Sequence, residues 1–120
     1  MPVLNDGAES ARSLLPLLVE RPIRLWEYHV SHRTLVMRGR SGDDDPSAYV
    51  EVVFTDVLGM KLRSYSYSSL EIREANTGTE MADFVPVPER HRERYLNLVV
   101  SGDGAEGFVV CANVHLREGR

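Results

Sequence analysis

The amino-acid sequence predicts a mainly β protein: an antiparallel two-layer sandwich or a curved half-barrel of six to seven strands, with one short N-terminal helix. Between residues 23 and 117, apolar residues recur with the period of two that is typical of half-buried strands. Short turn-rich segments separate these runs, and short connections imply antiparallel neighbours. The length of 120 residues and the hydrophobic content of 42% predict a single globular domain, residues 1–120.

The N-terminal arm, residues 1–22, is predicted to contain the helix. Polar residues at its start can cap a helix over residues 8–19. Pro16 would remove a backbone hydrogen bond from the interior of this helix, so the helix either ends near Leu14 or restarts beyond it. We expect the arm to cover one edge of a sheet or one mouth of a barrel, and residues 23–117 to form the antiparallel β domain.

The first two strands are predicted on either side of a slip in the apolar pattern. In Ile23–Val30 one face carries the larger aromatic side chains and is the predicted core face: Trp26, Tyr28 and Val30. The parity slips at Ser31–Arg33, which predicts a tight turn or a β-bulge, and Thr34–Arg38 resumes as the second strand. We favour a hairpin between the two.

The middle of the chain predicts two further strands. Ala48–Thr55 alternates strictly, and its predicted inward set is Val50, Val52 and Phe54. Residues 56–62 fit either a short helical turn or an extended crossing, because Gly59 interrupts an otherwise helical spacing. A pair of alternating apolar residues predicts a strand over Ser68–Ala75. Two prolines confine Met81–Val87 to a sheet edge or a connection.

Tyr95–Val100 and Phe108–Leu116 predict a C-terminal hairpin around a turn-rich loop, Ser101–Gly107. In its second strand one alternating set is apolar throughout and is the predicted core face: Phe108, Val110, Ala112, Val114 and Leu116. The other set begins apolar and becomes polar, as expected of an outer face: Val109, Cys111, Asn113, His115 and Arg117. A hairpin this apolar requires a sheet to join.

Charge and cysteine content exclude several classes of function. The net charge of −4 argues against nucleic acid as the main partner, because phosphate binding requires a positive field. A single cysteine cannot form an internal disulfide, which fits a reducing compartment. The apolar run Leu14–Val19 is too short for a signal peptide or for a span of the bilayer. We therefore expect a cytoplasmic protein that contacts neither nucleic acid nor a membrane.

No metal or cofactor site is predicted, although two groups of residues suggest one at first sight. His29 and His32 would face opposite sides of a continuous strand, and only a bend between them would bring them together. Asp43, Asp44 and Asp45 lack the glycine and the closing glutamate of a calcium loop. These aspartates are predicted to form a solvated loop or an electrostatic contact for a basic partner protein.

No catalytic residue is predicted. Cys111 and His115 share a strand face, but four residues along a strand span roughly 13 Å, too far for a nucleophile and its base. A histidine from a neighbouring strand, His29 or His91, could still meet Cys111, and the sequence leaves this open. We expect Cys111 to be a half-buried structural thiol.

Two candidate binding surfaces follow from the aromatic residues. Tyr65 and Tyr67 fall on one face of a serine-rich extended segment, which is either an exposed partner-binding surface or a pair of core tyrosines. A pocket on a curved sheet would instead be lined by a subset of these residues: Trp26, Tyr28, Tyr65, Tyr67, Asn113 and His115.

One run of residues in the first two strands precedes a C-terminal strand over residues 107–116: Trp26, Tyr28, His32, Leu35 and Met37. This layout, over residues 23–117, resembles small cytoplasmic bacterial all-β proteins, some of which are immunity proteins of polymorphic toxin systems. The resemblance implies a protein that binds and blocks a cognate toxin and catalyses no reaction.

We therefore predict a non-catalytic protein-interaction module, of immunity type, that binds and blocks a partner protein. The alternative is a small-ligand-binding protein or an enzyme that uses a pocket on a curved β-sheet, and a deep cavity lined by the aromatic residues would favour it. A homo-oligomer held by an exposed strand edge is a third option.

Overall fold

Two antiparallel sheets of five strands each make up the chain in the computed structural model, which describes residues 12–41, 45–75, 87 and 89–120. Sheet A has the order β1 (Leu17–Val19), β7 (Leu70–Glu74), β8 (Leu96–Gly102), β9 (Ala105–Cys111) and β5 (Gly59–Lys61). Sheet B has the order β10 (Asn113–Gly119), β4 (Tyr49–Thr55), β3 (Thr34–Arg40), β2 (Ile23–His29) and β6 (Ser66–Tyr67).

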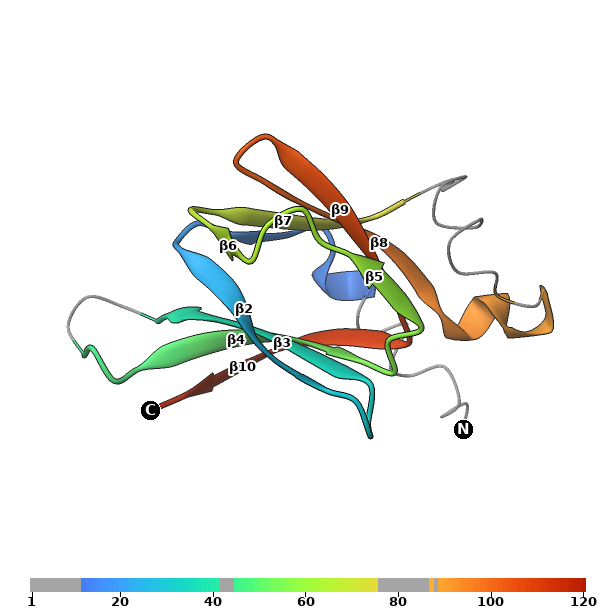
Figure 1. Ribbon diagram of the computed structural model, residues 1–120, viewed down its shortest axis with the longest axis horizontal. Coiled ribbons are helices and arrows are strands. Elements are labelled where there is room, and N and C mark those ends of the chain that lie inside the picture. Colours follow the sequence, from blue (N-terminus) through green and yellow to red (C-terminus); the bar gives the residue numbers. More distant parts are fainter. Residues whose placement is uncertain (1–11, 42–44, 76–86, 88) are drawn as a thin grey trace.

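The sheets form two layers, with β7, β8 and β9 above and β3, β4 and β10 below in Figure 1. The predicted mainly β antiparallel fold is confirmed, and the sandwich is the one of the two expected architectures that forms. The described residues form ten strands, more than the six to seven expected, because β1, β5 and β6 are too short to show an alternating pattern.

The hydrophobic core lies between the two sheets and takes one alternating set of side chains from each strand. The central strands contribute the fully buried members of this core: Leu35, Met37, Val52, Phe54, Ile72, Leu96, Leu98, Val100, Val109 and Cys111. Burying each such side chain contributes about 1.5–3 kcal/mol, so these strands supply most of the stability that fixes the two outer faces.

The C-terminal run from Phe108 to Leu116 is not one strand, because the chain leaves sheet A at Ala112 and enters sheet B. The break changes which side chains point inward, and in β9 the core-facing pair is Val109 and Cys111. The predicted core face is therefore wrong in β9. Beyond the break it is right at Val114, which is buried in the core, whereas Leu116 is 42% exposed on the edge strand β10.

The predicted core face of the first strand is also wrong for its three members: Trp26, Tyr28 and Val30. A β-bulge at Trp26 shifts the register of β2 against β3 and turns this side chain to the outer face. Val30 lies in the turn and is 78% exposed. Tyr28 stands opposite the buried Leu35 and so points to the side of the sheet that faces the core, yet it is 37% exposed.

The N-terminal arm contains a helical turn over residues 12–14, followed by β1 at the edge of sheet A. The expectation of a helix up to Val19 is wrong for residues 17–19, which pair with β7, whereas the alternative of a helix that ends near Leu14 agrees with the structure. Residues 1–11 lie outside the described residues.

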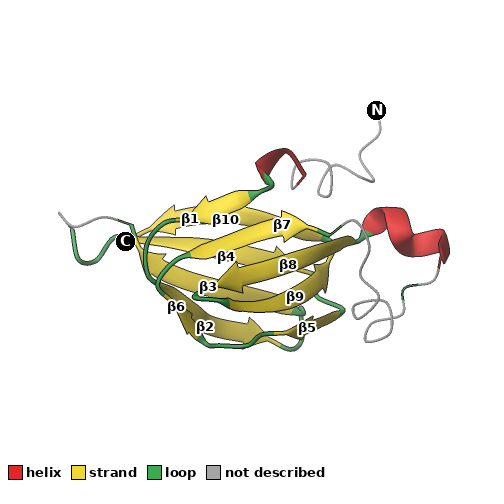
Figure 2. Ribbon diagram, turned by 90° about the horizontal axis from the view of Figure 1, so that it is seen from above, coloured by secondary structure: helices red, strands yellow, loops and turns green. Residues whose placement is uncertain are grey.

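A second, smaller apolar cluster covers the outer face of sheet A. Val99, Phe108 and Val110 are buried there against partly buried side chains that include Tyr95 and Val87. The charged run before Tyr95 is a 3-10 helix, η1 (Glu89–Arg94), which stands at one end of the sheets in Figure 2. The expected turn and extended segment over residues 76–87 fall outside the described residues except for Val87.

Two segments for which the sequence left the structure open or predicted a loop, residues 56–62 and 101–107, contain strand residues. Residues 56–62 are the extended crossing and not the helical turn, since they contain β5. The loop expected over residues 101–107 contracts to the turn Asp103–Gly104, where both residues have positive φ, at 53° and 78°. A two-residue Asp-Gly turn with this geometry matches the twist of the flanking strands.

Candidate functional site

One row of charged side chains crosses the outer face of sheet B. Arg24 on β2 lies opposite Arg38 on β3, Arg38 lies opposite Glu51 on β4, and Glu51 lies opposite Arg117 on β10. Directly opposed residues of neighbouring strands share a face, so the four side chains stand side by side. The row contains three arginines and one carboxylate, so it is cationic.

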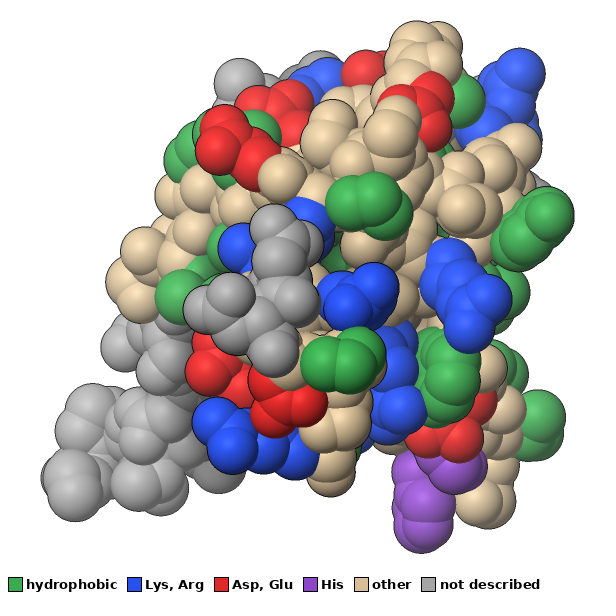
Figure 3. Space-filling view, turned by 90° about the vertical axis from the view of Figure 1, so that its left-hand side faces the viewer, with side chains coloured by type: hydrophobic (Ala, Val, Ile, Leu, Met, Phe, Trp, Pro, Cys, Tyr) green, Lys and Arg blue, Asp and Glu red, His purple; other side chains and the backbone are tan. Residues whose placement is uncertain are grey.

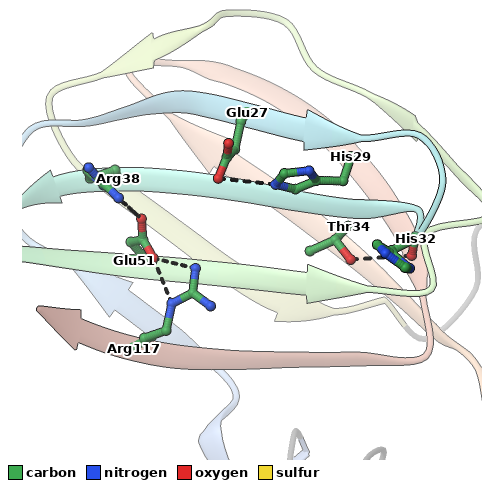
Figure 4. A network of polar contacts seen from close by, with 7 residues as sticks. All are labelled: Glu27, His29, His32, Thr34, Arg38, Glu51 and Arg117. Atoms are coloured by element: carbon green, nitrogen blue, oxygen red, sulfur yellow. Dashed lines mark hydrogen bonds and ion pairs between the residues drawn. The ribbon is translucent and has the colours of Figure 1, made fainter.

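Glu51 is fully buried, with 1% of its surface exposed, although it belongs to an outer face. Its Oε2 accepts a hydrogen bond from Arg38 Nε at 2.7 Å, and its Oε1 accepts one from Arg117 Nε at 2.7 Å (Figure 4). The Nη2 atoms of the two arginines lie 2.5 Å and 2.6 Å from the same oxygens. Burial by itself raises the pKa of Glu51, but the hydrogen bonds and charges of Arg117 and Arg38 outweigh it and hold the pKa below its ordinary value.

Arg38 also contacts two aromatic rings. Its guanidinium carbon lies 4.2 Å from the ring centre of Trp26 and 3.9 Å from that of Tyr49. The guanidinium carbon of Arg24 lies 5.2 Å from the same Trp26 ring centre. All three distances are within the range of about 6 Å for a cation–π interaction. We call these four residues the arginine–aromatic cluster: Arg24, Trp26, Arg38 and Tyr49.

An open hollow of about 400 Å³ adjoins the arginine–aromatic cluster. It lies between the start of β2, the end of β3 and the segment Pro46–Ala48 that leads into β4. All four cluster residues line it, together with Arg40. Figure 3 views this end of the molecule and shows Lys and Arg side chains interleaved with hydrophobic ones. The hollow therefore offers positive charge and aromatic surface together.

The two tyrosines of the serine-rich segment are not equivalent in the structure. Tyr65 is 73% exposed, whereas Tyr67 is 2% exposed and packs in the core between the sheets. The expectation that both lie on one face is wrong, since Tyr67 is in β6 and Tyr65 precedes this strand. Only Tyr65 is available to a partner.

The residues proposed for a pocket on a curved sheet do not come together. Trp26 borders the hollow, whereas Tyr28, Asn113 and His115 do not line it. Asn113 and His115 lie on β10, which is separated from β2 by two strands of sheet B. The prediction failed because the sequence does not reveal the order of the strands, which places β10 away from β2.

The acidic loop is described only in part. Asp43 and Asp44 lie outside the described residues. The Asp45 carboxylate accepts hydrogen bonds from the backbone and the hydroxyl of Ser47, and these hold its pKa below the ordinary value. It also lies 3.6 Å from Arg120 Nε.

Cys111 is in the core and not on an outer face, with none of its surface exposed. Desolvation raises the pKa of its thiol to about 12, so it is not a nucleophile at neutral pH. The histidines that could have met it lie elsewhere: His29 Nε2 is 3.2 Å from Glu27 Oε1, and His91 accepts a hydrogen bond from Arg90 Nε at 3.2 Å. In the described part of the chain, no group of three His, Cys, Asp or Glu side chains could hold a metal ion.

Sequence reasoning missed the arginine–aromatic cluster, and one signal could have found it. Arg24 and Trp26 are two residues apart on the first predicted strand, and Arg38 ends the second predicted strand. An arginine that shares a strand face with a tryptophan, next to a second strand that also carries arginine, indicates a cationic and aromatic sheet face. The signal was hidden because the aromatic face of the first strand was assigned to the core.

The chain matches no protein-family model, and neither the comparison with curated proteins nor that with solved structures found a match. Within the described ranges, no helix is long and apolar enough to cross a membrane. The function must therefore be argued from the outer face of sheet B itself.

Proposed function

We propose that this protein is a non-catalytic binding module that recognises another protein with the outer face of sheet B, centred on Trp26. The observation that carries the proposal is that Trp26 remains 42% exposed while two arginines hold its ring in place. Tryptophan, tyrosine and arginine supply most of the binding energy at protein interfaces. A side chain that is already fixed loses little conformational entropy on binding.

One more exposed aromatic side chain, Tyr65, lies beside β2 and supports the proposal. The Leu25 backbone N–H donates to the Tyr65 carbonyl at 2.7 Å, which holds the Tyr65 segment against β2. Beyond β6 the edge of β2 has no strand partner in the described part of the chain. An open edge beside a fixed aromatic ring suits a protein partner.

The narrower proposal is that the module blocks its partner, as immunity proteins block toxins. It is supported by the resemblance in strand layout and by the position of Asp45 next to the rim residues Pro46 and Ser47. The net charge of −4 favours long-range encounter with a basic protein, and this attraction would come from the acidic loop and not from the cationic row of sheet B. The attraction of such a partner by Asp43, Asp44 and Asp45 stays a prediction.

The experiment is a comparative pull-down from the native host, with the wild-type chain, Trp26→Ala and Leu18→Ala as baits. Leu18 is the matched control, since it is 59% exposed but lies on β1 of sheet A. Loss of a tryptophan hot spot costs about 2 kcal/mol or more, which weakens binding about thirtyfold. We expect one stoichiometric partner for wild type and Leu18→Ala, and its loss with Trp26→Ala.

A partner that all three baits retain equally would contradict the proposed surface. Circular dichroism spectra of the variants are the folding control, because neither side chain belongs to the core between the sheets. The blocking role is tested separately, by adding the purified chain to the captured partner and measuring whether the partner's activity falls.

A further inference from the structure

The hollow beside the arginine–aromatic cluster carries more positive charge than the described residues around it neutralise. Arg38 is paired with Glu51, but Arg24 and Arg40 have no carboxylate partner in the described part of the chain. Arg24 stands directly opposite Arg38. Like charges in that arrangement destabilise an antiparallel pair, and an anion in the hollow would relieve the repulsion.

Asp45, at the rim of the hollow, does not supply the missing negative charge. Its carboxylate is engaged by Ser47 and lies 3.6 Å from Arg120 Nε. Of the described residues that line the hollow, none is an aspartate or a glutamate. The described part of the lining thus combines three guanidinium groups with no acidic side chain.

Arg38 has hydrogen-bond donors that remain free. Its Nε and Nη2 are directed at Glu51 Oε2, while Nη1 makes no hydrogen bond with any described residue. The side chain is 27% exposed and is held in place by Glu51 and by the rings of Trp26 and Tyr49. A guanidinium fixed in this way is preorganised for carboxylate or phosphate oxygens.

The size and the lining of the hollow indicate that its ligand has an apolar part in addition to the anionic group. A volume of about 400 Å³ is within the range of about 300–1,000 Å³ that is usual for small-molecule sites. Trp26, Tyr49 and Ile23 supply apolar and aromatic surface beside the arginines. An inorganic ion would leave this surface uncovered, whereas a flat apolar group would cover it.

We propose that the hollow binds a small organic anion, in which a carboxylate or phosphate group is joined to a flat apolar body. Arg24, Arg40 and Nη1 of Arg38 receive the anionic group. Trp26 and Tyr49 contact the body. This site goes beyond the recognition of a protein partner, and it can exist whether or not the protein-binding proposal holds.

The test uses Trp26, the only tryptophan of the chain, as a reporter on the wall of the hollow. The indole N–H signal of the purified full chain is followed by NMR during titration with benzoate, phenyl phosphate and benzamide. Benzamide has the shape of benzoate without its charge. We expect saturable shifts with both anions and an affinity for benzamide that is weaker by about tenfold, the effect of losing one charge-assisted contact. The tighter of the two anions identifies the anionic group as carboxylate or phosphate.

Three variants assign the site. Arg24→Gln and Arg40→Gln should each weaken binding of the tighter anion by about tenfold. Arg94→Gln is the matched control, since Arg94 is exposed on η1 and does not line the hollow, and it should bind as wild type does. Equal affinities for benzoate and benzamide, unchanged binding by both Arg24→Gln and Arg40→Gln, or the absence of any saturable shift would each overturn the proposal.

Discussion

Glu51 is the residue on which the geometry of the outer face of sheet B depends. An ionised carboxylate that is 1% exposed is costly unless its oxygens are hydrogen-bonded and its charge is paired. Here each oxygen has its own guanidinium, from Arg38 or from Arg117. Because the same Arg38 contacts the Trp26 and Tyr49 rings, the carboxylate also fixes the aromatic surface that we propose as the binding site.

We expect Glu51→Gln to lower the free energy of unfolding at pH 7 by about 1.5–3 kcal/mol, the value of hydrogen bonds to a charged group. The pKa of Glu51 in the folded protein lies below its unfolded value of 4.5. Its contribution to stability is therefore fully present above pH 4.5 and is lost as the pH falls through the folded pKa. Urea unfolding of wild type and variant across this range measures the difference.

The control for this substitution is Glu71→Gln, because Glu71 lies on sheet A with 41% of its side chain exposed and its partner Arg73 is 3.9 Å away. Exposed pairs contribute about 0–1 kcal/mol, so this variant should resemble wild type. A gap between wild type and Glu51→Gln that persists unchanged at acid pH would show that the charge of Glu51 is not the cause.

Tyr67 allows the opposite kind of substitution, one that should stabilise the protein. Its hydroxyl oxygen is buried and has no hydrogen-bond partner among the described residues. Removing an unsatisfied buried polar group removes its desolvation cost, so Tyr67→Phe should raise the free energy of unfolding by about 1 kcal/mol. Tyr95→Phe is the matched comparison and should be destabilising, since the Tyr95 hydroxyl donates to Asp56 at 3.1 Å. A Tyr67→Phe variant less stable than wild type would mean that the hydroxyl has a partner.

At the scale of elements, the strands could be predicted where one face meets the core and the other meets water. Thr34–Arg40 and Tyr49–Thr55 were found within a few residues for this reason. Two elements were assigned to the wrong face because a single residue shifts the parity: the bulge at Trp26 and the break at Ala112. Neither Trp26 nor Ala112 is a glycine or a proline, so the sequence carries no local signal of the shift. The order of the strands in the sheet, which brings Arg24 next to Arg38, is set by long-range packing and cannot be predicted from local patterns.

The close packing of β9 against β5 leads to a prediction about Gly107, which lies in β9. A Cβ atom at Gly107 would lie 2.1 Å from the carbonyl oxygen of Lys61, at the end of β5. Backbone cannot move aside as a flexible side chain can, so Gly107→Ala should lower the free energy of unfolding by about 1–3 kcal/mol. Gly104→Asn is the control, because no atom lies within 4 Å of its Cβ position and asparagine tolerates a positive φ. Equal stability of Gly107→Ala and wild type in urea would contradict the pairing of β5 with β9.

At the scale of the whole molecule, the two outer faces differ in kind. Sheet A carries an apolar cluster on its outer face, whereas sheet B presents arginines and exposed aromatic side chains at one end. A chain of net charge −4 thus carries a local cationic surface. The core between the sheets holds the exposed face of sheet B in shape.

The most direct measurement is amide hydrogen exchange of the purified chain, alone and bound to the partner captured by the wild-type bait. We expect slower exchange on binding in β2, Ile23–His29, and in the rim segment Pro46–Tyr49, with β7 and β8 unchanged. Protection confined to β1, η1 or the free edge of β10, with β2 exchanging as in the unbound protein, would contradict it.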